Sequence, residues 1–257
     1  MYKKILLLYK SISKTPLQTI EEFRRKNPFF TNIKLSYAGR LDPMAEGLLL
    51  VLIGDENKNR SIYENLTKTY EFSVLFGIET DSYDILGIPQ IVSTKPWTDD
   101  DESLLYQYMK TYIGTYKQSY PPFSSKPVHG KPLYKWAREG KLGEINIPSH
   151  EVTITSFEKH DSCTMSIHEL KNLINKQITP LTGAFRQNEI IISWEKLLKQ
   201  TKTRMFPVLS FVISCSSGTY VRGVAHELGQ SLKKGGITLS IKRTCIGNFT
   251  LDDISTK

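Results

Sequence analysis

The sequence predicts an α+β fold in a single domain. Segments with the two-residue apolar period of strands are interspersed with segments whose apolar residues follow helical spacing. The chain has 257 residues, of which 39% are hydrophobic and 23% charged, and this is enough to build one large core. The sequence shows no heptads, repeats or low-complexity linkers. We therefore expect residues 1–257 to form one domain.

The N-terminal third is predicted to begin with a strand over residues 5–9 and a capped helix. Thr15 is the expected N-cap, Pro16 occupies the first helical position, and Gln18 completes a capping box. The apolar stripe of this helix is expected to comprise Leu17, Ile20 and Phe23. Further elements expected here are a buried strand over 48–53, a polar helix over 56–66 and a strand over 70–76.

In the rest of the chain, the acidic run 99–102 predicts a helix start, because negative charge stabilises a helix N-terminus. Prolines make residues 120–127 a stiff loop, since they prevent regular pairing. The other expected elements are helices over 133–138 and 221–232 and strands over 152–157 and 211–215. Residues 160–208 are the least patterned part, and we interpret them as an insertion.

The charge balance favours a polyanionic partner. The net charge is +8 and the isoelectric point about 9.2, which fits nucleic-acid binding, although solubility alone could explain it. The three cysteines are scattered, which argues for a reducing compartment and against a disulfide framework. The N-terminal apolar run is too short for a signal peptide, and the run ending at Ile53 is too short to span a membrane. We therefore expect a cytoplasmic protein without a membrane partner.

Several chemistries lack their sequence motifs. There is no P-loop, GxGxxG, GxSxG or HExxH motif, and the five histidines do not have metal-ligand spacing. We therefore expect no metal and no nucleotide-cradling loop of these types. What remains is carboxylate chemistry assisted by arginine, tyrosine and lysine on a basic surface.

One segment suggests what that carboxylate does. Residues 37–49, YAGRLDPMAEGLL, place Asp42 on a proline-bounded loop directly before a buried strand, and they resemble the catalytic loop of the TruB family of tRNA pseudouridine-55 synthases. Further segments match that family in the same order. They are LYK at 8–10, KTY at 68–70 with FGIETDSYD at 76–84, QSYPPFSSK at 118–126 with LY at 133–134 and AREG at 137–140, and CSSGTYVR at 215–222.

The resemblance implies a pseudouridine synthase fold, with a mixed, largely antiparallel central sheet, peripheral helices and a catalytic cleft. It also implies an isomerase that converts a flipped-out uridine to pseudouridine, most simply uridine 55 in the T-loop of tRNA. The enzyme would act as a monomer on RNA, without cofactor or metal. Two departures from the family are expected: the insertion at about 160–208, and the absence of a C-terminal PUA-type RNA-binding domain.

The resemblance also assigns roles to individual residues. Asp42 would attack the nucleoside or act on its sugar as a base, and these alternatives stay open. Arg222 would pair with Asp42, Tyr70 would stack on the base, and Tyr220 and Ile241 would line the pocket. The remaining expected substrate contacts are Lys10 and Tyr37, which stands where the family usually has histidine. Candidate phosphate contacts are Lys10, Lys68, Lys126, Lys131 and Arg138.

The same residues also allow other interpretations of their roles and of the function of the chain. Taken without the resemblance, Asp42 fits a turn, Tyr70 fits core packing and Arg222 fits a surface ion pair. The same isomerisation could act on ribosomal or other RNA, or the chain could be a non-catalytic RNA-binding or RNA-folding protein. A glycosidase would need a second placed acid, and Asp81 and Asp84 are interpreted as turn residues.

Overall fold

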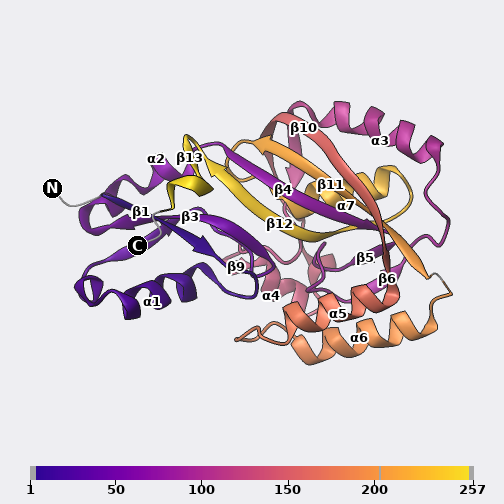
Figure 1. Cartoon of the computed structure of the whole chain (residues 1–257), viewed down its shortest axis with the longest axis horizontal. Coiled ribbons are helices and arrows are strands. Elements are labelled where there is room, and N and C mark those ends of the chain that lie inside the picture. Colours follow the sequence, from indigo (N-terminus) through magenta and orange to yellow (C-terminus); the bar gives the residue numbers. More distant parts are fainter. Residues whose placement is uncertain (1–3, 203, 255–257) are drawn as a thin grey trace.

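The molecule is built on one long twisted sheet (Figure 1). The computed structural model describes residues 4–202 and 204–254. In the described part, the nine-stranded sheet has the order β1 (Ile5–Lys10), β3 (Ala45–Ile53), β12 (Gly236–Ile246), β4 (Lys68–Phe76), β11 (Met205–Cys215), β10 (Ser149–Ser166) and β7 (Gly114–Ser119), with β2 (Leu35–Ala38) paired to β3 and β13 (Phe249–Thr250) to β12. The β3–β12 pairing is parallel and the other pairings in this sheet are antiparallel. This confirms the predicted α+β class with a mixed, largely antiparallel sheet.

Helices and small hairpins surround the sheet. The helices are α1 (Pro16–Lys26), α2 (Arg60–Glu64), α3 (Asp99–Tyr112), α4 (Leu133–Arg138), α5 (Ile167–Ile178), α6 (Gln187–Gln200) and α7 (Val221–Ser231). The hairpins pair β5 (Ile78–Thr80) with β6 (Pro89–Ile91), and β8 (Pro127–Val128) with β9 (Lys131–Pro132). Short 3-10 helices cover Pro28–Phe30, Gly54–Asn59, Leu142–Glu144 and Leu251–Asp253. None of the helices in residues 4–202 and 204–254 is long and apolar enough to cross a membrane.

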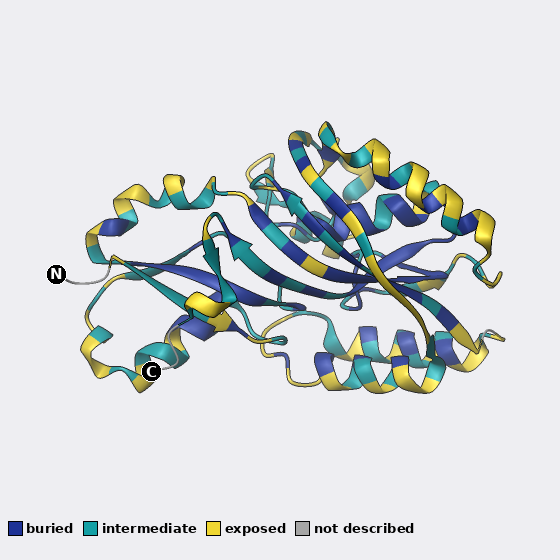
Figure 2. Ribbon diagram, turned by 45° about the horizontal axis from the view of Figure 1, so that its top comes forward, coloured by how far each residue is buried: buried dark blue, intermediate teal, exposed yellow. Residues whose placement is uncertain are grey.

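The period of two in the central strands creates two cores. Phe72, Val74 and Phe76 of β4 point to one face, where α3 and α7 pack against them. Leu75 points to the opposite face, toward α5 and α6. Figure 2 shows the buried centre of the sheet and the exposed outer sides of the helices. The sheet is thus covered on both faces in its middle, which makes it a rigid support.

Several local predictions are confirmed. Thr15 and Gln18 form the expected capping box, and α3 starts with a second one between Thr98 and Asp101. One position of the predicted stripe on α1 is wrong. Leu17 is 59% exposed, whereas Ile20 is 1% exposed, because only the second lies on the side of α1 that packs against β3. The polar helix expected over 56–66 is a 3-10 helix over Gly54–Asn59 followed by α2.

The prediction that residues 160–208 lack pattern is also wrong. Strand β10 continues to Ser166, α5 and α6 form an antiparallel helical hairpin, and β11 begins at Met205. The buried residues of each helix follow helical spacing and pack beneath the sheet: Leu170, Ile174 and Ile178 on α5, and Ile190, Trp194 and Leu198 on α6. No strand was predicted over 236–246 either, yet β12 lies near the middle of the sheet.

Candidate active site

Asp42 lies on a tight turn between β2 and β3. The Ala45 amide donates to the Asp42 carbonyl at 3.0 Å, and the Ser13 amide donates to the Pro43 carbonyl at 2.9 Å. Gly47, two residues into β3, has φ 108°, and a Cβ atom there would lie 2.3 Å from the Arg243 carbonyl oxygen. The turn is therefore held by its own backbone, by the Ser13 loop and by a close approach to β12 that requires glycine.

Arg222, near the start of α7, holds the Asp42 carboxylate. Its Nε donates to Asp42 Oδ2 at 2.7 Å, and its Nη1 donates to the Ser82 carbonyl at 2.5 Å. The Arg222 side chain is 4% exposed, whereas that of Asp42 is 39% exposed. The cation is enclosed while the carboxylate still reaches solvent, so Arg222 can orient Asp42 without blocking it. The structure thus brings these two predicted site residues together.

A second carboxylate lies beside this pair. Asp84 Oδ2 is 3.6 Å from Arg222 Nε, and Asp84 Oδ1 accepts from Ser82 Oγ at 2.6 Å and the Leu86 amide at 2.9 Å. Burial raises the pKa of Asp84. Burial lowers the pKa of the Arg222 guanidinium, but the charges of Asp42 and Asp84 outweigh it and raise that pKa above its usual value. Asp84 is a turn residue as expected, and it also completes the surroundings of Arg222.

Tyr220 is fixed beside the ion pair by a buried glutamine. Gln118 accepts from the Tyr220 amide at 2.8 Å and donates to the Tyr220 carbonyl at 3.1 Å. The Tyr220 ring meets Tyr120 and His150 edge-on, with centroids 5.7 and 6.2 Å away. Burial, followed by the Asp42 charge, raises the pKa of the Tyr220 hydroxyl. No role was predicted for Gln118 from the sequence, although this glutamine directly precedes SYPP in the matched segment.

Tyr70 and Ile241 lie in the hydrophobic cluster that includes Leu41 and Ala45 on either side of Asp42. Tyr70 is 9% exposed and Ile241 is 6% exposed. Burial raises the pKa of Tyr70, and the neighbouring Arg243 guanidinium opposes this shift. The two residues therefore border the turn that carries Asp42 from the sheet side. Their expected contacts with a base stay a prediction.

Lys10 and Tyr37 have other surroundings. Lys10 is fully buried, with Nζ donating to the Ala45 carbonyl at 2.5 Å and the Ser11 carbonyl at 3.1 Å. Burial lowers its pKa to about 8. In this structure Lys10 supports the turn that carries Asp42, and its ammonium is not placed to meet a phosphate. Tyr37 packs on the α1 side of β3, and Arg60 lies 5.8 Å over its ring.

The other candidate phosphate contacts also have protein partners. Lys68 is 5% exposed and donates to the Glu64 and Leu66 carbonyls. Lys131 pairs with Glu139, and Arg138 donates to the Ala184 carbonyl. Lys126 lies 5.0 Å over the Tyr120 ring. Lys68 is enclosed, so the candidate phosphate contacts that lie near the surface are Lys126, Lys131 and Arg138.

Arg243 is a residue of the candidate site that was not predicted from the sequence. Its side chain is buried, and its Nε donates to the Leu48 carbonyl at 2.8 Å while Nη1 donates to the Arg40 carbonyl at 3.2 Å. Arg243 and Lys10 thus hold the backbone on both sides of Asp42 from β12 and β1. The available signal was a cation in the middle of an apolar segment, where unpaired charge is costly.

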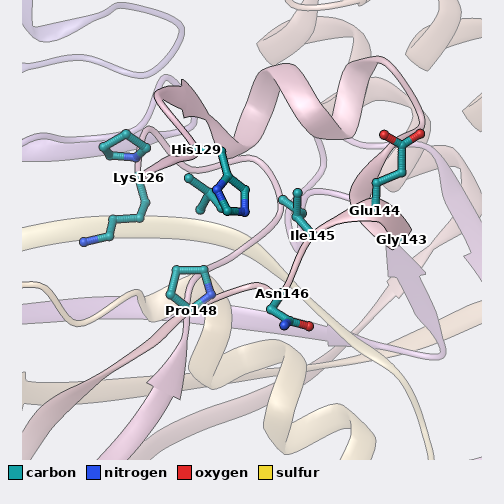
Figure 3. A pocket seen from close by; sticks show the side chains of 9 residues that line it. Lys126, His129, Gly143, Glu144, Ile145, Asn146 and Pro148 are labelled. Atoms are coloured by element: carbon teal, nitrogen blue, oxygen red, sulfur yellow. The ribbon is translucent and has the colours of Figure 1, made fainter.

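Asp42 and Arg222 line neither of two hollows found in the described part of the chain. The larger, about 540 Å³, is seen in Figure 3, where Lys126 and His129 line its upper side and Pro148 and Asn146 its lower side. The smaller, about 400 Å³, is lined by residues of the α1 and α5 regions, including Ser13, Gln18, Lys176 and Gln177. Among residues 4–202 and 204–254, no group of three or more His, Cys, Asp or Glu side chains could hold a metal ion.

The fold matches solved pseudouridine synthases. A structure of a Cbf5–Nop10–Gar1 complex superimposes with a TM-score of 0.56 at 14% identity, covering 96% of this chain and 49% of that one. A structure of an H/ACA RNP bound to a substrate RNA containing 2′-deoxyuridine gives a TM-score of 0.53, also at 14% identity, covering 96% of this chain and 48% of that one. The present chain therefore has a pseudouridine synthase fold and spans about half the length of those chains.

The sequence defines the family more closely. Residues 26–173 match the N-terminal domain of the TruB family of pseudouridylate synthases, and the chain belongs to this family. It is similar to tRNA pseudouridine synthase B of Thermosipho melanesiensis, with 30% identity over 96% of this chain and 65% of that protein. The protein of the same name from Opitutus terrae is also 30% identical, over 98% of this chain and 84% of the relative. That from Parabacteroides distasonis is 27% identical over 97% and 88%.

Proposed function

We propose that this protein is a tRNA pseudouridine synthase that isomerises uridine 55 in the T-loop of tRNA. The observation that carries the proposal is the Asp42–Arg222 pair, in which a 2.7 Å hydrogen bond orients a half-exposed carboxylate on a braced turn. Family membership and the names of its relatives support the choice of reaction and substrate.

The reaction balances without a redox partner. The bond between C1′ and N1 of uridine breaks, C1′ bonds to C5 of the same base, C5 loses a proton and N1 gains one. Asp42 either forms a covalent bond to the nucleoside while the base turns, or removes a proton from the sugar. Both routes need a carboxylate held at a fixed angle to the substrate, and the Arg222 contact provides that. Because no electrons are exchanged with another group, we propose that no cofactor or metal takes part.

The substrate base must leave the RNA stack before Asp42 can reach its sugar. Flipping a base costs a few kcal/mol, which contacts in the pocket must offset. Tyr220 lies beside the ion pair with its backbone fixed, and Tyr70 and Ile241 border the turn from the sheet. Stacking on such rings supplies roughly 1–3 kcal/mol per base. We therefore propose that these three residues receive the uracil ring.

An RNA substrate also bears on the compartment in which the protein acts and on the surface that binds the RNA. We propose a monomer that acts on RNA in the cytoplasm, with the net charge of +8 drawing the phosphate backbone to the protein. Lys126, Lys131 and Arg138, near the larger hollow, are the proposed phosphate contacts. Residues 1–257 are proposed to act as one domain, with α5 and α6 as an insertion in the catalytic unit.

The proposal is tested with tRNA transcripts tritiated at uridine C5. Wild-type protein should release tritium from a transcript with uridine at position 55, and Asp42→Asn should release none above background while still binding the RNA. A transcript with cytidine at position 55 is the matched substrate control. Tight binding without release by the wild type would favour an RNA-binding protein instead.

The alternatives give different products in the same assay. Release from ribosomal RNA but not from tRNA would overturn the substrate assignment and keep the reaction. A glycosidase would yield free uracil. Asp84, the second acid near Asp42, has both carboxylate oxygens committed within the protein, which argues against that chemistry.

A further inference from the structure

The tip of the α5–α6 hairpin lies against the turn that follows β5. Arg186, the residue before α6, makes a bidentate ion pair with Asp81, with Nη1 to Oδ2 at 2.9 Å and Nη2 to Oδ1 at 3.2 Å. The same guanidinium lies 4.3 Å over the Phe123 ring. Its side chain is 19% exposed and that of Asp81 is 37% exposed, so the arginine is the more shielded partner of this contact. A bidentate pair of this kind fixes direction as well as distance.

Asp81 connects the Arg186 contact to the proposed active site. Its Oδ1 also accepts from the Ile88 amide at 2.9 Å, so the carboxylate closes the turn over residues 81–88. The next residue, Ser82, offers its carbonyl oxygen to Arg222 Nη1 at 2.5 Å, and Arg222 Nε holds Asp42 at 2.7 Å. A movement of the Asp81 turn would therefore move one of the two groups that aim the Arg222 guanidinium.

We propose that Arg186 is a positioning residue for the reaction at Asp42, acting through the Asp81–Ser82 turn and Arg222. The inference rests on the proposed function and adds to it a role for the α5–α6 hairpin. A displacement of about 1 Å at a reacting group can cost about a hundredfold in rate, which gives such a contact a kinetic consequence.

The backbone at the tip supports this role. Arg186 has φ 61° and ψ 28°, a left-handed conformation that a non-glycine residue rarely adopts. The surrounding tip is fixed by Gln187, whose Nε2 donates to the Leu181 carbonyl at 3.1 Å and the Gly183 carbonyl at 2.7 Å. Glycine would adopt this conformation with less strain, so the presence of arginine indicates that its side chain has a role at this position.

The hairpin is anchored well enough to act as a support. Trp194 of α6 is 1% exposed, and its Nε1 donates to the Ile85 carbonyl at 3.0 Å, inside the same turn region as Asp81. At the end of α5, the Gln177 carbonyl accepts from Ser13 Oγ at 2.6 Å, and the Ser13 amide in turn donates to the Pro43 carbonyl next to Asp42. The hairpin therefore braces the catalytic turn from two directions.

The test compares steady-state kinetics of tritium release from the tRNA transcript. Arg186→Ala and Asp81→Asn should each lower kcat by about 10- to 100-fold with KM changed less than about twofold. Because both act on one contact, the double variant should be no slower than the slower single variant. Arg186→Lys should have an intermediate kcat, since lysine keeps the charge without the fork.

The matched control is Lys171→Ala, which removes an exposed ion pair with Glu195 on the same hairpin, 3.2 Å long. It should keep the wild-type kcat, and thermal melting should show the same Tm for every variant within a few degrees. A folded Arg186→Ala with wild-type kcat would overturn the proposal, as would a rise in KM alone, which would indicate a direct RNA contact. If Arg186→Ala does not fold, Asp81→Asn decides, and wild-type kcat there overturns the proposal. Absence of activity in the wild type would overturn the proposed function instead.

Discussion

At the residue scale, Arg222 combines two contacts that only its planar fork can make together. Nε reaches the Asp42 carboxylate and Nη1 reaches the Ser82 carbonyl, and the side chain is nearly fully enclosed. A lysine carries one compact donor group and cannot satisfy both partners in the same geometry. The aim of Asp42 thus depends on the shape of the guanidinium as well as on its charge.

We therefore expect Arg222→Lys to lower kcat for tritium release by at least about a hundredfold, because loss of preorganised orientation costs this much in comparable sites. Arg25→Lys, which changes an exposed arginine on α1, is the control and should keep the wild-type rate. Equal rates for Arg222→Lys and the wild type would show that charge alone is sufficient.

A half-buried acid on α7, Glu227, gives the protein a pH-dependent stability. Burial raises the pKa of Glu227 to about 7, while its hydrogen bond with Tyr116 opposes the shift. The folded pKa lies above the unfolded one, so the stabilisation is present below the unfolded pKa and is lost as pH rises through the folded value. Burial lowers the pKa of the neighbouring His226 from 6.5 to about 4, which gives the opposite slope between these two values, in a window that overlaps that of Glu227.

The free energy of unfolding of the wild type should therefore fall relative to that of Glu227→Gln between pH 5 and 8, by up to about 3 kcal/mol. Urea denaturation of both proteins at pH 5, 6, 7 and 8 measures this difference, in which the contribution of His226 cancels. A difference that stays constant over this range would contradict the assignment.

At the scale of elements, the α5–α6 hairpin depends on a few buried side chains. Trp194 fills the space between α6 and the sheet and donates to Ile85. Trp194→Ala should lower the free energy of unfolding by about 3–5 kcal/mol, because it leaves a large cavity and an unpaired carbonyl. Ile192→Ala on the same helix is the control, since Ile192 is 65% exposed, and it should change stability by less than about 0.5 kcal/mol. Urea denaturation at one pH compares the two, and similar losses would mean that the hairpin packs differently.

The elements also show which parts of the structure the sequence could predict. The capping box at Thr15 involves residues three apart, so its signal is local and was recognised, whereas at Thr98 only the acidic run after the cap was recognised. The box at Ser166, with Glu169, has the same form and was overlooked because residues 160–208 were interpreted as an insertion. Strand β12 was missed because Lys242 and Arg243 interrupt its apolar run.

The residues of the candidate site show the same difference between local signals, which could be recognised, and distant partners, which could not. Asp42 and Arg222 were found through the matched motifs, whereas the roles of Gln118 and Arg243 depend on neighbours far along the chain. Gln118 meets Tyr220, and Arg243 meets the carbonyls of Arg40 and Leu48. Such partners follow from the sheet order, and one sequence alone does not specify that order.

At the scale of the whole molecule, the excess of positive charge predicts salt-sensitive RNA binding. With the three proposed phosphate contacts, the affinity for a tRNA transcript should fall about 40-fold between 50 and 200 mM salt. Fluorescence anisotropy titrations at several salt concentrations measure the slope. Asp42→Asn is the control, because it leaves the basic surface unchanged and should give the same slope. An affinity independent of salt would contradict binding through the phosphates.

The ion pair at the centre of the site joins residues 180 positions apart. A ribosome makes the acid 180 residues before the guanidinium. A nascent chain therefore carries Asp42 without the partner that aims it while these residues are added, and long-range pairings of this kind form late in folding. We expect the growing polypeptide to stay inert toward cellular RNA until β12 and α7 have emerged and joined the sheet.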